Sequence, residues 1–147
     1  MRKIRTRIAE LTYDKDRILR VKLFDDAEIE LEDAIQNYEA TIAITQGEKF
    51  LVMVDATSNV SVSKEARAFV ALTKENEKRI AEAFITTSVA NKLVGNFYIN
   101  FNKPKTPTKI FSSETDAIKW LESFLYLTES KNISHAPVFA NLKQSFG

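Results

Sequence analysis

Residues 49–55 read Lys-Phe-Leu-Val-Met-Val-Asp, and this short apolar run decides the class of fold. Leu51, Val52, Met53 and Val54 are consecutive apolar residues, so both faces of the segment should be covered, as in a strand of a parallel sheet. A sheet covered on both faces needs a layer of helices on each side. The stretch therefore predicts a domain of the α/β class.

The segments around this run alternate between strand and helix patterns. Residues 4–12 and 17–24 alternate polar and apolar side chains across a turn-rich connection, which predicts a hairpin. Gly47 stands where a left-handed residue commonly ends a helix. Helix N-termini can be capped by Ser63, by Thr87 or Ser88, and by Ser113, which has Asp116 three residues later as in a capping box. Apolar residues three or four positions apart predict helices over 31–46, 64–78, 89–100 and from Ser113 through Leu125. Short apolar runs predict two more strands, over 80–86 and 108–112.

The resulting order is β-β-α-β-α-β-α-β-α, within one domain over residues 1–127. It predicts a mixed central sheet with an N-terminal hairpin, parallel later strands and helices on both faces. The aromatic residues on these elements are expected in the core, Phe97 and Phe101 included. Residues 128–147 form a C-terminal tail, polar at first and apolar again from Val138. This tail is either frayed or a short helix that docks on its own domain or on a second subunit.

Composition excludes several kinds of chemistry. The 147 residues include no Cys, one His and three Gly. Disulfides, thiolate metal sites, iron–sulfur clusters and thiol catalysis need Cys, and glycine-rich phosphate loops need more Gly. A Ser-His-Asp triad could be composed from Ser63, His135 and Asp55, but nothing in the sequence brings these residues together. No Ser has the flanking glycines of a nucleophile elbow. We therefore predict no metal and no cofactor.

The net charge of +1 hides a strong segregation of charge. Residues 1–22 carry eight bases and three acids, residues 23–48 carry eight acids and no base, and residues 49–147 carry 13 bases and nine acids. This pattern indicates either a charged partner surface or a basic hairpin beside an acidic helix in one domain. A pI of 7.9 argues against nucleic-acid binding by a basic stripe of Arg5, Arg7, Arg20 and Lys22.

Secretion and membrane signals are also weak. Arg5, Arg7 and Glu10 interrupt any apolar segment after the basic start. No run approaches the ~20 apolar residues of a membrane-spanning helix. We expect a soluble, cytoplasmic protein.

Polar residues follow the predicted parallel strands, where open α/β sheets commonly bind ligands. Free N–H groups at the helix N-termini that follow would favour an anion. Each Ser or Thr could instead be a simple helix cap, and Asp55 an acceptor for N–H groups of the next loop. The candidate ligand or partner-binding residues are Asp55, Thr57, Ser58, Ser61, Ser63, Arg67, Thr87, Ser88 and Lys92.

Several short motifs occur together in an order that resembles a known family. They are Val54-Asp55, Ser63 with Glu65-Ala66-Arg67, Asn102-Lys103-Pro104 with Pro107, and Ala117 with Trp120-Leu121. Over most of residues 4–125 the chain resembles SpoIIAA-like proteins of the STAS/SEC14 type, in particular small stand-alone bacterial members of unknown function. The resemblance implies an α/β domain used mainly for protein–protein contact. In relatives that are switched by phosphorylation, the loop after a central strand reads Asp-Ser-Ser-Gly. This chain has Ser61-Val62-Ser63-Lys64-Glu65 there, so the motif is absent.

These observations lead to a functional hypothesis and two alternatives. The first is a non-enzymatic protein-interaction and regulatory module, a homodimer to which the tail contributes. The second is a binder of a small anionic or lipid-like ligand at the carboxyl ends of the parallel strands, since SEC14-like relatives bind lipids. The third is a hydrolase or transferase that uses carboxylates alone. A deep apolar pocket near the strand ends would favour the second over the first.

Overall fold

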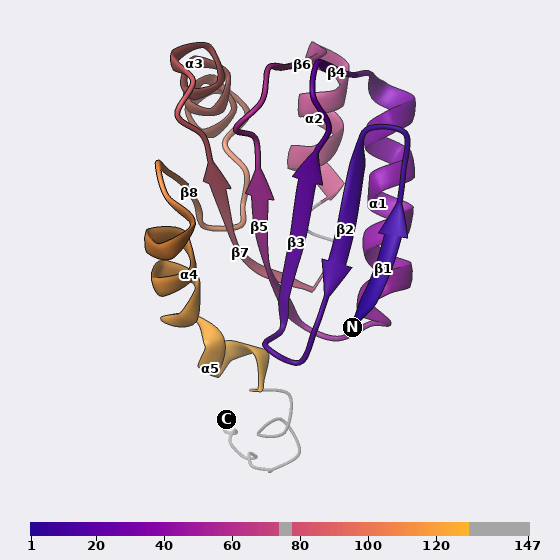
Figure 1. Ribbon diagram of the computed structural model, residues 1–147, viewed down its shortest axis with the longest axis vertical. Coiled ribbons are helices and arrows are strands. Elements are labelled where there is room, and N and C mark those ends of the chain that lie inside the picture. The colour runs from indigo at the N-terminus through magenta and orange to yellow at the C-terminus, as the bar shows by residue number, and fades with distance from the viewer. Residues whose placement is uncertain (74–77, 130–147) are drawn as a thin grey trace, which may run out of the picture.

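The computed structural model describes residues 1–73 and 78–129, and a mixed six-stranded sheet forms its centre (Figure 1). The first three strands are antiparallel, and the last four in the sheet run parallel to one another. The predicted mixed sheet is thereby confirmed. In spatial order the strands are β1 (Arg2–Arg5), β2 (Ala9–Tyr13), β3 (Ile18–Leu23), β5 (Phe50–Asp55), β7 (Arg79–Ile85) and β8 (Thr108–Phe111).

Helices cover both faces of this sheet, as the apolar run of β5 requires. Val52 and Val54 of β5 belong to a core shared with α1 (Leu31–Thr45) and α2 (Lys64–Thr73). Leu51 and Met53 point to the other face, where they join a second core with α4 (Glu114–Glu122) and α5 (Leu125–Thr128). Alternate side chains of one buried strand thus serve two cores.

The first predicted strand, residues 4–12, is wrong as a single element. The chain reverses after Arg5, so that β1 and β2 form a hairpin of their own. Thr6 closes the turn, because its N–H donates to the Ala9 carbonyl at 2.9 Å and its Oγ1 accepts from the Ala9 N–H at 3.1 Å. Polar and apolar side chains alternate both before and after such a tight turn, so the sequence pattern does not reveal the turn.

A small parallel pair of strands was also not predicted. β4 (Ala27–Ile29) pairs with β6 (Val60–Val62) as a separate two-stranded sheet. Each strand has three residues, too few for a period of two to stand out. The pair ties the segment before α1 to the segment before α2.

The predicted helix caps are confirmed. The Oγ atoms of Ser63, Ser88 and Ser113 accept the N–H groups of Ala66, Asn91 and Asp116 at 3.1–3.2 Å. At the end of α1, Gly47 has a φ of +79°, but the left-handed conformation already begins at Gln46. Of the predicted helix over 64–78, the structure shows α2 as far as Thr73, and residues 74–77 lie outside the described part.

The two later helices differ in their ends. The helix predicted over 89–100 is α3 (Val89–Phe97) followed by a π-helical turn, η2 (Tyr98–Asn102). The helix after Ser113 is interrupted before Phe124, so α4 and α5 are separate. Thr128, predicted to open the tail, is the fully buried last residue of α5. The rest of the predicted tail, residues 130–147, expected to be a frayed end or a short docking helix, lies outside the described residues.

The predicted core position of Phe97 and Phe101 is wrong. Both side chains are exposed, and their rings stack on each other with centroids 4.8 Å apart. Tyr98 and Asn91 are the buried residues of this segment instead. Apolar residues four positions apart show that a helix has an apolar face, but they do not show which face meets the sheet.

Candidate functional site

An apolar cavity of about 180 Å³ lies between the sheet and the helices of one face. Val52 and Val54 of β5 and Phe84 of β7 form its floor, and Phe69 and Val70 of α2 form part of its roof. The same cavity reaches α1, the β4–β6 pair and the inner side of α3. Cavities of roughly 150 Å³ with such apolar linings accommodate a single aromatic ring.

Arg67 brings a positive charge to the cavity wall. It lies in the first turns of α2, and its Nη1 donates to the Val62 carbonyl at 2.7 Å. Its guanidinium carbon lies 4.9 Å from the centroid of the Phe97 ring. The Nε of Arg67 is buried and has no hydrogen-bond partner among the described residues. A guanidinium N–H can donate to a carboxylate or another acceptor.

A buried ion pair lines another part of the cavity. Arg79 and Glu82 lie on β7, and their Nη1 and Oε2 atoms are 3.0 Å apart. Their side chains are only 9% and 3% exposed. The Arg79 guanidinium also lies 5.7 Å from the Phe50 ring. Charges buried to this degree are tolerated when they are paired, because a lone charge would be costly to desolvate.

Asn91 closes the cavity near the carboxyl ends of the strands. Its Nδ2 donates to the carbonyls of Ala56 and Ser58, each at 2.6 Å. These bonds attach α3 to the loop that follows β5. In Figure 1, α3 accordingly lies beyond the carboxyl end of β7.

Three of the residues predicted for the strand-end site bond to nearby side chains in the loops. Asp55 Oδ1 accepts the N–H of Thr57 at 3.0 Å and its hydroxyl at 2.8 Å, as expected for an acceptor in the next loop. The other carboxylate oxygen lies 3.6 Å from Lys22 Nζ. Ser58 donates its hydroxyl to Asp25. These side chains therefore organise the loop.

The remaining predicted residues separate into different places. Ser63 and Ser88 are helix caps, and Ser61 is exposed on β6. Thr87 is exposed and Lys92 is half-buried on α3. Of the nine residues, Arg67 alone lines the cavity. The structure thus brings together an apolar cavity and one predicted cation rather than the whole polar cluster.

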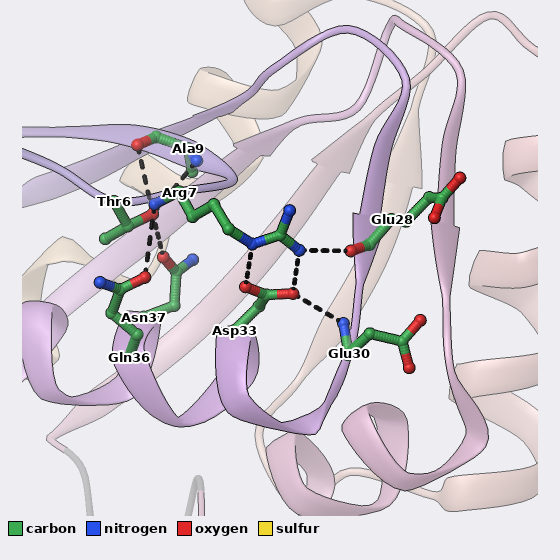
Figure 2. Close-up of polar contacts among 8 residues, drawn as sticks. All are labelled: Thr6, Arg7, Ala9, Glu28, Glu30, Asp33, Gln36 and Asn37. Atoms are coloured by element: carbon green, nitrogen blue, oxygen red, sulfur yellow. Dashed lines mark hydrogen bonds and ion pairs between the residues drawn. The ribbon is translucent and has the colours of Figure 1, made fainter.

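The basic stripe of the N-terminal hairpin is largely paired within the domain. Arg7 donates from Nε to Asp33 Oδ1 at 2.7 Å and from Nη2 to Oδ2 and to the Glu28 carbonyl (Figure 2). The hydrogen bond from Arg7 lowers the pKa of Asp33 and raises that of Arg7 itself. Arg20 pairs with Asp16 at 2.9 Å. A basic hairpin beside an acidic helix is therefore realised inside the domain.

Sequence reasoning missed Asn91, Arg79 and Glu82. The two charges could have been noticed, because Arg-Ile-Ala-Glu-Ala-Phe-Ile places a Glu inside an apolar strand. Asn91 had no such signal, since an Asn at the start of a helix is ordinary. Its role depends on carbonyls 33 and 35 residues away in the sequence.

The fold identifies the class of protein. A similar solved structure is an uncharacterised protein of the DUF3478 family with a SpoIIAA-like fold from Shewanella loihica PV-4. It has 18% sequence identity and a TM-score of 0.55, and the match covers 77% of this chain and 91% of that chain. The domain therefore has a SpoIIAA-like fold, as the sequence motifs predicted.

The chain belongs to the family described as Domain of unknown function (DUF7793), whose model matches residues 12–125. A second solved structure, a protein of unknown function from Arthrobacter sp. FB24, has 26% identity and a TM-score of 0.30, covering 76% of this chain and 97% of that one. No curated protein matches the sequence. None of the helices within residues 1–73 and 78–129 combines the length and apolar character needed to cross a membrane.

Proposed function

We propose that this domain is a non-catalytic binding module for a small, largely apolar molecule that carries an acidic group. The observation behind the proposal is the apolar cavity of about 180 Å³ with the guanidinium of Arg67 in its wall. Binding sites for small molecules are commonly apolar, with a few polar groups that orient the ligand. The ligand's apolar part would lie over Val52, Val54 and Phe84.

Arg67 accounts for the acidic group. Its Nη1 is occupied by the Val62 carbonyl, whereas its buried Nε has no hydrogen-bond partner among the described residues. A carboxylate would supply an acceptor, and the bond would be strengthened by charge. The other charged residues of the wall, Arg79 and Glu82, already pair with each other. Arg67 is therefore the residue expected to choose an anionic ligand over a neutral one.

The test compares two molecules of one shape, 4-methylbenzoate and its neutral analogue p-xylene. Methyl-resolved NMR of the full chain should show shifts at Val52, Val54 and Val70 with both, and tighter binding of the carboxylate. Arg67→Met should remove the preference for the carboxylate and retain p-xylene binding. Arg20→Met is the matched control, because Arg20 lies at Asp16, outside the cavity lining.

A cavity-filling variant supplies a second measurement. Val70→Phe places a ring in the space over β5, so binding of both probes should weaken together while the protein stays folded. Absence of methyl shifts with either probe would contradict the cavity as a binding site. Equal binding of both probes by the unaltered protein would contradict the role of Arg67.

A further inference from the structure

The outer side of α3 and η2 carries an exposed row of large apolar side chains, which we name the α3 stripe. Its members are spaced four residues apart, and the inner side of the same segment carries the buried Asn91 and Tyr98. Single exposed apolar residues are ordinary, but a continuous row marks an interaction surface. The α3 stripe consists of Val89, Leu93, Phe97 and Phe101, whose exposures are 74%, 65%, 46% and 65%.

The stretch of sequence that carries the α3 stripe contains bases and no acids. Between Glu82 and Glu114 the sequence contains no acid, and it contains four lysines, Lys92, Lys103, Lys105 and Lys109. Lys103, Lys105 and Lys109 are exposed, and Lys92 is half-buried. A partner for the α3 stripe should therefore combine an apolar face with negative charge.

The outer side of α1 has those two properties, and we name it the α1 face. Leu31, Ile35 and Ile42 lie on it at helical spacing, with exposures of 36%, 37% and 47%. Residues 23–48, which include α1, carry eight acids and no base. The exposed Glu32 and Glu39 lie within the helix itself. α1 has 15 residues, and α3 with η2 has 14, so both segments are roughly 20 Å long.

We infer that the α3 stripe of one copy of this chain docks on the α1 face of a second copy. A symmetric contact of α3 with α3 would place lysines against lysines, and α1 with α1 would place acids against acids. Only the unlike pairing brings opposite charges together. α1 and α3 lie on opposite sides of α2 (Figure 1), so one copy can use both surfaces at once.

We take the two surfaces of one copy to engage two different neighbours, so that the contact does not close after two copies. The average mass should therefore rise continuously with concentration instead of stopping at twice 16.7 kDa. One helix against one helix is a small interface, below about 1,200 Å², so we expect weak association. Raising the salt to about 0.5 M should weaken it further, because exposed charges are screened over a few ångströms.

The test uses two variants of the full chain, each with one damaged surface. Leu93→Glu damages the α3 stripe and Ile42→Lys damages the α1 face. Each variant alone should remain monomeric in sedimentation velocity up to about 1 mM, where a weak complex of the unaltered chain is populated. An equimolar mixture should form a dimer that grows no further, since each variant retains one intact surface.

Leu72→Glu and Leu72→Lys are the matched controls, because Leu72 is 68% exposed on α2, outside both surfaces. They should associate as the unaltered chain does. All four changes are at exposed positions, and circular dichroism melts of each variant should show a folded protein. An unaltered chain that stays monomeric at about 1 mM overturns the inference. A mixture that fails to associate also overturns it, and so does a variant that associates by itself, which would indicate a symmetric contact. Loss of phosphatidylglycerol vesicle binding in Leu93→Glu without any self-association of the unaltered chain overturns it as well.

Discussion

Arg7 and Asp33 join the turn between β1 and β2 to the first turn of α1 through two parallel hydrogen bonds (Figure 2). Asp33 is buried, and its Oδ2 also accepts the Glu30 N–H at 2.9 Å, which caps the helix. One carboxylate thus fixes both the helix start and the hairpin that lies beside it. The pair also explains why a strongly acidic helix can lie next to a basic hairpin.

This pair predicts a pH-dependent stability. The hydrogen bond from Arg7 lowers the pKa of Asp33 in the folded state. The Asp33 carboxylate therefore stabilises the fold above its unfolded pKa of about 3.9, and this stabilisation is lost as the pH falls through the lower folded-state pKa. Asp33→Asn should therefore lower the melting temperature at neutral pH, and the difference from the unaltered protein should narrow below about pH 4. Glu32→Gln, at an exposed neighbouring position, is the control. A difference that is equally large at pH 3 and pH 7 would contradict the role of the charge.

The buried pair Arg79–Glu82 predicts a non-additive response. Glu82→Leu or Arg79→Met alone should cost about 3 kcal/mol of unfolding free energy, because the remaining buried charge loses this ion pair. The double variant Arg79→Met with Glu82→Leu should recover most of this loss, since neither charge then remains. Urea denaturation measures all three. Losses that simply add in the double variant would show that the two residues act independently.

Asn91 predicts a local effect at the loop after β5. Asn91→Ala should cost about 1–3 kcal/mol, because the buried Ala56 carbonyl loses its donor. Asn91→Asp should be at least as damaging, since a carboxylate cannot donate to two carbonyls. Hydrogen exchange should speed up around residues 56–58 in both. The exposed Asn96→Ala is the control, and an equal effect there would contradict the assignment.

The close contact between Gly95 and Ile110 predicts that a smaller residue at position 110 will make an alanine at position 95 better tolerated. A Cβ at this position would lie 2.7 Å from Ile110 Cδ1, at the close approach of α3 to β8. Gly95→Ala favours the helix by about 1 kcal/mol through propensity, yet it must displace that methyl group. Ile110→Val removes the methyl at a cost of about 1 kcal/mol. The double variant should be more stable than the sum of the single effects. Strict additivity in thermal melts would show that the contact is unimportant.

Much of the fold could be predicted from local pattern. The apolar run of β5, the cap residues Ser63 and Ser88, and the spacing of α1 each report on neighbours within a few residues. These signals were sufficient for the α/β class and the mixed sheet, and the short motifs for the SpoIIAA-like fold. The turn at Thr6 and the strands β4 and β6 were missed because they depend on very short segments or on distant pairing.

The sequence by itself determined the periodicity of each element, the strand buried on both faces and the segregation of charge between residues 23–48 and 83–113. Only the tertiary structure decided which helix faces meet the sheet. Val89, Leu93, Phe97 and Phe101 form an apolar face in the sequence, yet that face is exposed, because Asn91 and Tyr98 occupy the inner side. The cavity beside Arg67 also exists only in the assembled domain. Its volume depends on how residues far apart in the chain pack together, and no local pattern records that packing.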